Sequence, residues 1–132
     1  MSFQHFDSCK ESLPVIREYV RRQISGLDDI LSNQIILAVD EVCANSILHG
    51  RGRRAPFQLN IRIIREAAEV VVEIEDSAEA FPVHLQIRIS PEEKIRNRQK
   101  GGLGLALVQR IMDQIEIVQV SDHHIIRLIK HL

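Results

Sequence analysis

The hydrophobic pattern is strongest between residues 35 and 50, where the sequence reads IILAVDEVCANSILHG. The stretch is long enough for a helix and nearly apolar around its whole circumference, which predicts a buried helix. Glu41, Asn45 and His49 interrupt it at every fourth position and therefore lie in one line along that helix. A single polar group in such a place would indicate a core residue that has found its partner, because an unpaired one is costly. Three on one stripe favour the wall of a binding site.

Helical spacing also runs through the preceding segment, LPVIREYVRRQI, with Ser12 as its expected N-cap and Gly26 at its end. Residues 27–33 are then expected to connect the two helices. Weak alternation at residues 3–7 predicts a short first strand.

Alternation of apolar and polar residues predicts two further strands, at residues 57–64 (FQLNIRII) and 69–75 (EVVVEIE). The short connection between them predicts an antiparallel hairpin. Asp76 follows the second strand directly. Alone it would indicate an ordinary turn acid.

The second half of the chain continues with a polar, basic segment at residues 83–100, whose length is typical of a functional or mobile loop. GGLGLALVQRIMDQ then predicts an amphipathic helix opened by glycines, with Leu103, Leu107 and Ile111 on one face. IEIVQV and HIIRLIK predict two closing strands. This order of elements predicts a single α+β domain over residues 1–132, a two-layer sandwich with helices on one face of a mostly antiparallel sheet.

Composition and charge argue against some classes of function. The formal net charge of −1 argues against a nucleic-acid binder, and 4% aromatic residues without Trp argue against stacking on single-stranded bases. Cys9 and Cys43 are far apart and are expected to be free thiols in a reducing compartment. The first ten residues lack the apolar core of a signal peptide and no apolar run is long enough to span a bilayer, so we expect a cytoplasmic protein without a membrane partner.

The glycine cluster at residues 101–104 suits phosphate binding, because glycines at a helix start let backbone amides approach an anion. A tight turn is the alternative for a glycine cluster taken alone. The segment is not a P-loop, since no Lys-Ser/Thr pair follows the glycines. It is not a dinucleotide fingerprint either, since no strand directly precedes it and Leu107 occupies the place of the third glycine.

Taken together, these pieces resemble the Bergerat-fold ATPases, the superfamily of the DNA gyrase, heat-shock chaperone, histidine-kinase and mismatch-repair ATP domains. EVCANSILHG at residues 41–50 matches the family's E-x-x-x-N-x-x-x-H-G helix, and GGLGLAL at 101–107 matches its second glycine box. DSAEAF at 76–81 is similar to its D-x-G-x-[GP]-F loop. The closest resemblance is to the single-domain anti-sigma regulatory factors with serine-kinase activity, and it spans about residues 13–130.

The resemblance implies that ATP and Mg²⁺ are the cofactors. Asn45 would hold Mg²⁺ through its side-chain oxygen, Glu41 would orient or deprotonate the attacking hydroxyl or water, and Asp76 would accept a hydrogen bond from the adenine amino group. Residues 83–100 would form a lid over the nucleotide, and His49 would be structural. The remaining nucleotide contacts would come from Ala78, Lys100, Gly101, Gly102, Leu103, Gly104 and Leu105.

The sequence departs from the family pattern on the adenine side. Ala78 and Ala80 stand where the family has glycine and glycine or proline, and His124 stands near a family threonine. Two functions therefore stay open. The first is an ATP·Mg²⁺-binding anti-sigma factor that holds a sigma factor and phosphorylates a serine on an anti-anti-sigma antagonist. The second is a non-catalytic protein-binding module on the same fold with weakened or lost nucleotide binding. Homodimerisation is left open by the sequence.

Overall fold

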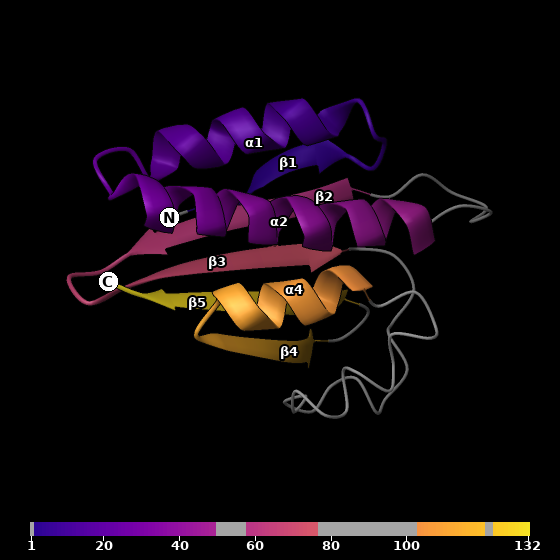
Figure 1. Cartoon of the computed structure of the whole chain (residues 1–132). Helices are drawn as coiled ribbons and strands as arrows, with labels where there is room; N and C mark the ends of the chain where they lie inside the picture. Colours follow the sequence, from indigo (N-terminus) through magenta and orange to yellow (C-terminus); the bar gives the residue numbers. More distant parts are fainter. Residues whose placement is uncertain (1, 50–57, 77–102, 121–122) are drawn as a thin grey trace.

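The computed structural model describes residues 2–49, 58–76, 103–120 and 123–132 of the chain, and Figure 1 shows how they are arranged. These residues form three helices and five strands. In chain order the elements are β1 (Gln4–Asp7), α1 (Ser12–Gln23), α2 (Asp29–His49), β2 (Gln58–Arg65), β3 (Glu69–Asp76), α4 (Leu103–Ile111), β4 (Gln114–Val120) and β5 (His123–His131).

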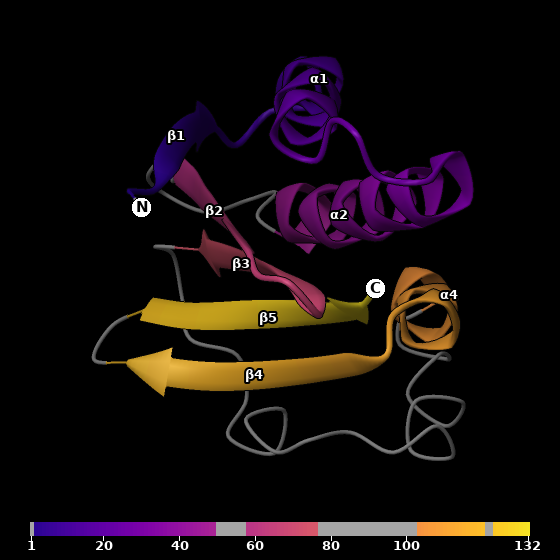
Figure 2. The ribbon, with the colours of Figure 1, turned by 90° about the vertical axis from the view of Figure 1, so that its left-hand side faces the viewer.

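The five strands form one sheet in the order β1-β2-β3-β5-β4, and every neighbouring pair is antiparallel. The helices α1, α2 and α4 lie side by side on one face of this sheet, with α2 in the middle (Figures 1 and 2). The prediction of an α+β two-layer sandwich is confirmed. The predicted hairpin is also confirmed, with β2 and β3 paired and the Glu66 N–H donating to the Glu69 carbonyl across the turn at 2.9 Å.

The core lies between the helices and the inner face of the sheet. Alternation in the strands sends one set of apolar side chains toward the helices, as the period of two requires. The largest fully buried side chains come from α1, α2, the strands and the segment between α1 and α2, and they are Ile16, Val20, Ile24, Ile35, Val39, Val42, Leu59, Ile61, Val70, Ile74 and Leu128.

Helix α2 differs from its prediction in length and in burial. It begins at Asp29 rather than near residue 35, because the Asp28 carboxylate accepts hydrogen bonds from the N–H groups of Ile30 (3.0 Å) and Leu31 (3.3 Å) and caps an earlier start. The helix is also not buried all round, since Ile30 is 69% exposed and Leu37 41%. Apolar residues thus continue onto the solvent-exposed face of the helix. For this reason the sequence pattern predicted a helix that is buried all round.

The other two helices need smaller corrections. Ser12 is the first residue of α1 rather than its cap, and Glu11 precedes it without a side-chain cap hydrogen bond. In α4, Leu107 is 38% exposed whereas Val108 is buried, as is Met112 directly after the helix, so the buried face lies one residue further along than predicted. Within the described part of the chain, no helix has the length and apolarity needed to cross a membrane.

Candidate functional site

One flank of α2 faces α1. An Arg17 guanidinium nitrogen of α1 lies 3.6 Å from the Asp40 carboxylate of α2, which identifies that flank. At about 100° per residue, Glu41 lies about 100° and Asn45 about 140° around the helix axis from Asp40, in the same sense. Figure 2 shows α2 between α1 and α4. From the helix geometry, these two side chains therefore lie on the flank of α2 toward α4.

Asn45 carries an unsatisfied polar atom. Its side-chain nitrogen is buried and has no hydrogen-bond partner. Such an atom in a folded protein costs about 1–3 kcal/mol, so a native structure usually keeps it for a reason. A half-turn of the carboxamide places its oxygen at the same point, and oxygen is the ligand that Mg²⁺ prefers. The unsatisfied amide therefore fits a bound ion or ligand.

Glu41 lies one turn before Asn45 on the same flank and is likewise half-buried rather than fully buried. Among the residues that the structure describes, no cluster of three or more His, Cys, Asp or Glu side chains could hold a metal ion.

Asp76 is the last residue of β3 and lies opposite Leu59 of β2 and His124 of β5. Its side chain is only 3% exposed. Its position beneath α2 is indicated by Cys43, whose thiol pKa is raised by burial first and then by the negative charges of Asp40 and Asp76. Asp76 therefore lies under the part of α2 that carries Glu41 and Asn45, as a buried acid at a strand end.

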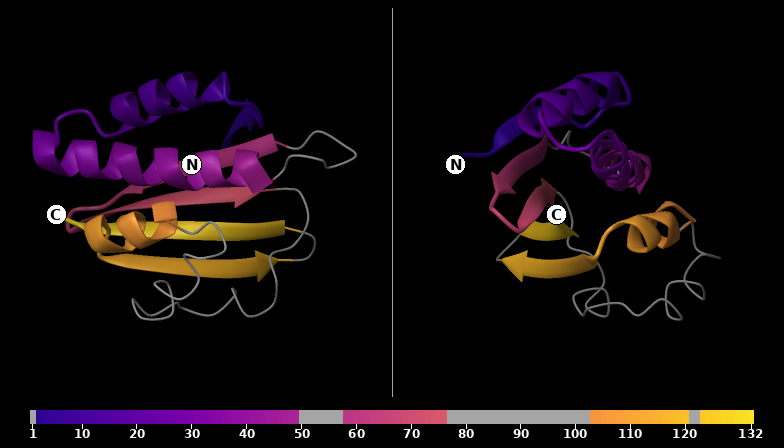
Figure 3. Two further views of the ribbon diagram at one scale, coloured as in Figure 1. Left: turned by 45° about the vertical axis from the view of Figure 1, so that its right-hand side comes forward. Right: turned by 60° about the vertical axis from the view of Figure 1, so that its left-hand side comes forward.

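The start of α4 completes the arrangement. Figure 1 shows the C-terminal end of α2, the end of β3 and the beginning of α4 at one end of the molecule. Leu103, Gly104 and Leu105 form the first turn of α4, whose N–H groups have no partner within the helix. A helix start of this kind favours a phosphate. The predicted helix is thus present as α4, which lies beside α2 (Figure 3), whereas Gly101 and Gly102 before it lie outside the described residues.

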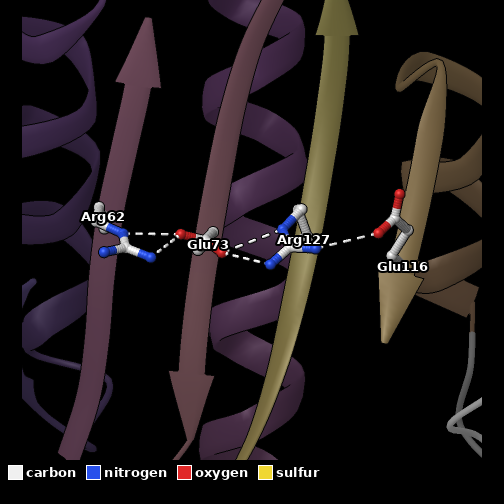
Figure 4. Close-up of polar contacts among 4 residues, drawn as sticks. All are labelled: Arg62, Glu73, Glu116 and Arg127. Carbon is white, nitrogen blue, oxygen red and sulfur yellow. Dashed lines mark hydrogen bonds and ion pairs between the residues drawn. The ribbon is translucent and has the colours of Figure 1, made fainter. Parts of the chain in front are cut away.

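Several predicted contacts lie outside the described residues and stay predictions. They are the lid at residues 83–100 and the contacts from Ala78, Lys100, Gly101 and Gly102. The structure brings the end of β3, which carries Asp76, the C-terminal half of α2, which carries Glu41 and Asn45, and the first turn of α4 toward one another. Sequence reasoning missed a charged row across the sheet, because no single segment shows it. The row consists of Arg62, Glu73, Arg127 and Glu116, which are joined by ion pairs from strand to strand (Figure 4).

The two cysteines provide a test of this packing. Cys43 is fully buried and burial raises the pKa of its thiol, whereas Cys9 is exposed. We expect a thiol reagent such as 5,5′-dithiobis-(2-nitrobenzoate) to modify Cys9 alone in the native protein and both cysteines in urea, since the thiolate is the reactive form. Rapid modification of both cysteines in the native protein, or of Cys43 in a natively folded Cys9→Ser variant, would contradict the packing of α2 against β3.

Comparisons with known proteins show the family to which the chain belongs. Residues 6–130 match the family model described as histidine kinase-like ATPase domain. The serine-protein kinase RsbW of Bacillus licheniformis is 27% identical over 136 residues, covering 90% of this chain and 82% of that protein. The serine-protein kinase RsbW of Halalkalibacterium halodurans is 26% identical over 130 residues, covering 87% of this chain and 78% of that protein.

Two solved structures share the fold. One is the crystal structure of the RsbU and RsbW domains of Rv1364c from Mycobacterium tuberculosis, with a TM-score of 0.63 and 14% identity. That match covers 98% of this chain, which spans only 32% of the larger one. The other is the histidine kinase domain of the blue-light activated kinase EL346 from Erythrobacter litoralis, with a TM-score of 0.59, 18% identity, and coverage of 91% and 59% of the two chains.

Proposed function

Because this chain belongs to the histidine kinase-like ATPase domain family, we propose that it binds ATP·Mg²⁺ and acts as an anti-sigma factor with serine-kinase activity. In this proposal it holds a sigma factor and transfers the γ-phosphate of ATP to a serine on an anti-anti-sigma antagonist. The observation that carries the nucleotide site is the buried side-chain nitrogen of Asn45 on α2, which has no hydrogen-bond partner. The RsbW relatives, named serine-protein kinases, support the choice of reaction.

Each residue of the site has a defined task in this proposal. Asn45 holds Mg²⁺, which when bound neutralises phosphate charge. Glu41, one turn away on the same flank, accepts the proton of the attacking serine hydroxyl. Asp76, buried at the end of β3, accepts a hydrogen bond from the adenine amino group. The first turn of α4 directs its free N–H groups at the phosphates. Sigma factors act with RNA polymerase, so the proposal also places the protein in the cytoplasm.

Titration calorimetry with ATP, with and without Mg²⁺, tests the nucleotide site. We expect Mg²⁺-dependent binding in the unmodified protein and its loss in Asn45→Ala, because the variant removes the oxygen ligand. Asn33→Ala is the matched control, since Asn33 is an exposed asparagine on the same helix and the same change there is expected to leave binding intact.

The calorimetry also separates the two functions left open by the sequence. Absence of binding at millimolar ATP would overturn the kinase proposal, and the non-catalytic module would then be the function that the fold supports. In that case Ala78 and Ala80 would be the first residues to replace by glycine, to test whether their methyl groups prevent ATP binding. If Mg²⁺-dependent binding persists in Asn45→Ala, the protein binds ATP but Asn45 does not hold the metal.

A further inference from the structure

A groove lies between one edge of the sheet and helix α1. β1 is the outermost strand on this side, and among the strands that the structure describes it pairs with β2 alone. After β1 the chain turns back, so α1 lies beside it and runs in the opposite direction (Figure 1). The groove has a volume of about 300 Å³ and is lined by Gln4, Phe6, Val15, Tyr19, Arg22 and Gln23. This volume is at the lower limit of ligand pockets and suits one or two side chains rather than a whole cofactor.

The base of the groove is aromatic. The rings of Phe6 and Tyr19 meet edge to face, with their centroids 5.4 Å apart. Phe6 is buried in the core, and the Tyr19 hydroxyl donates to the Ile61 carbonyl at 3.5 Å, which holds the tyrosine ring in place. Val15 borders the groove and is 56% exposed. An apolar side chain placed here would remove the surface of Val15 and of the ring edges from water, which is favourable.

One end of the groove carries positive charge. Val15, Tyr19 and Arg22 follow one another at spacings of four and three, so they form one line along α1. The Arg22 side chain is 71% exposed, and its Nε lies 3.9 Å from Glu18. Glu18 bonds more closely to Arg21, at 2.8 Å. One carboxylate is thus shared by two arginines, and the positive charge in excess complements a carboxylate from a partner.

The edge of β1 offers main-chain hydrogen bonds. In an antiparallel pair, successive residues direct their N–H and C=O groups alternately toward the partner strand and away from it. Every second residue of β1 therefore directs these groups away from β2. Extended peptides bind at such edges, where main-chain hydrogen bonds provide affinity and pockets for alternate side chains provide specificity.

The spacing along α1 determines which residues of a peptide meet the groove. The point midway between Val15 and Tyr19 is about 7.5 Å from the level of Arg22, at 1.5 Å per residue. Two residues of an extended chain span about 6.7 Å and point to the same side. A peptide antiparallel to β1, like every strand pair of this sheet, runs in the direction of α1. It therefore brings its apolar residue to the aromatic base first and a residue two positions later to Arg22.

We infer that this groove binds an extended segment of a partner protein, which pairs with β1 and carries an apolar residue followed two positions later by an acidic one. The apolar side chain packs on Phe6 and Tyr19, and the acidic side chain pairs with Arg22. The groove lies on the α1 side of α2, whereas the proposed nucleotide site lies on the α4 side (Figure 2). Binding is therefore tested without ATP, and its failure would leave the proposed function unaffected.

A synthetic peptide tests the groove, with amide NMR of the ¹⁵N-labelled chain as the readout. The probe is acetyl-Thr-Thr-Leu-Thr-Glu-Thr-amide, in which threonine favours an extended chain. We expect chemical-shift changes confined to β1, α1 and their surroundings. Exchanging the glutamate with the threonine before it should weaken binding about 10-fold, because the acid then points away from Arg22. Absence of shift changes at about 2 mM peptide, where millimolar affinity is still detected, would overturn the inference.

Charge exchange tests the contact with Arg22. Arg22→Glu should weaken binding of the probe about 10-fold, and a probe with lysine in place of glutamate should bind this variant as the original probe binds the unmodified chain. Lys10→Glu is the matched control, since Lys10 is exposed in the turn before α1 and does not line the groove. The same loss in Lys10→Glu, or no recovery with the lysine probe, would overturn the pairing with Arg22.

N-methylation of the probe tests the pairing with β1. Successive N–H groups of an extended strand face opposite sides, so only alternate ones can donate to β1. One probe carries a methyl group on the leucine nitrogen and a second carries it on the nitrogen of the following threonine. One of the two should bind about 10-fold more weakly than the other, because it loses a hydrogen bond to β1 and places a methyl group against the strand. Equal affinities of the two probes would overturn the addition of a strand at β1.

Discussion

Replacing Glu73 by glutamine is expected to lower the free energy of unfolding by about 2–3 kcal/mol. The Glu73 side chain is only 3% exposed and bonds both Arg62 and Arg127, so its loss leaves two guanidinium groups facing each other across an uncharged amide. The effect stays below that of a fully buried pair because the arginines are 31% and 33% exposed and keep part of their hydration. Urea denaturation measures the change.

Glu116→Gln is the matched control for this prediction. Glu116 lies at the end of the same row, is 30% exposed and contacts Arg127 alone among the other three charges. Its replacement is expected to cost under about 1 kcal/mol. Both variants are compared at a protein concentration at which sedimentation shows only monomer. Equal losses would contradict a network centred on Glu73.

The stability contributed by Glu73 also depends on pH. Burial alone raises the pKa of Glu73, but hydrogen bonds from Arg127 and Arg62 and their charges outweigh it and hold the pKa below its ordinary value of 4.5. A carboxylate with a lowered folded pKa stabilises the fold above its unfolded pKa, and this contribution disappears as pH falls through the folded pKa. The difference between wild type and Glu73→Gln should therefore be full at pH 6 and shrink below about 4.5.

The charged row illustrates what the sequence alone could not provide. Alternation predicted the strands that carry Arg62 and Glu73, since period-two patterning is local. The order of the strands and their register depend on contacts between distant segments. Nothing within β5 or β4 indicates that Arg127 would lie between Glu73 and Glu116.

The fold class was predictable because the helices and strands differ in period and follow each other in a simple order. The missed boundaries have local causes. Asp28 caps α2 before its apolar run begins, so a start predicted from that run alone is too late. In α4, spacing alone gave Leu107 to the buried face, whereas packing against α2 and the sheet buries Val108. The ends of a helix depend on its capping residues, and its buried face depends on the elements that pack against it. Neither can be read from the hydrophobic period alone.

The candidate site was predictable in part. Fourfold spacing placed Glu41 and Asn45 on one line of a helix, and the structure keeps them on one flank of α2. The buried position of Asp76 beneath Cys43 was not predictable, because a single acid after a strand more often forms a turn. The site could be recognised as a whole only after β3, α2 and α4 were seen to end or begin at the same edge of the molecule.

Replacing Glu41 by glutamine is expected to reduce phosphoryl transfer about 10²–10⁴-fold while ATP binding is retained. Glutamine keeps the size and hydrogen bonding of the side chain but cannot accept the proton of a serine hydroxyl. Transfer is measured with γ-labelled ATP and a purified anti-anti-sigma protein from the same genome, and binding is measured by calorimetry. Asp40→Asn is the matched control, because Asp40 is the adjacent acid on the flank toward α1.

The two measurements together assign the role of Glu41. Loss of transfer with retained binding identifies a proton acceptor, since substrate still enters the site but the chemical step fails. Loss of both would mean that Glu41 maintains the shape of α2, where it lies one turn from Asn45. Retention of both would remove Glu41 from the reaction and direct the search for a base to another residue. Asp40→Asn removes the same charge from the same helix. If it reduces phosphoryl transfer as much as Glu41→Gln does, the loss is due to the net charge of α2 and not to a proton acceptor on the flank that faces α4.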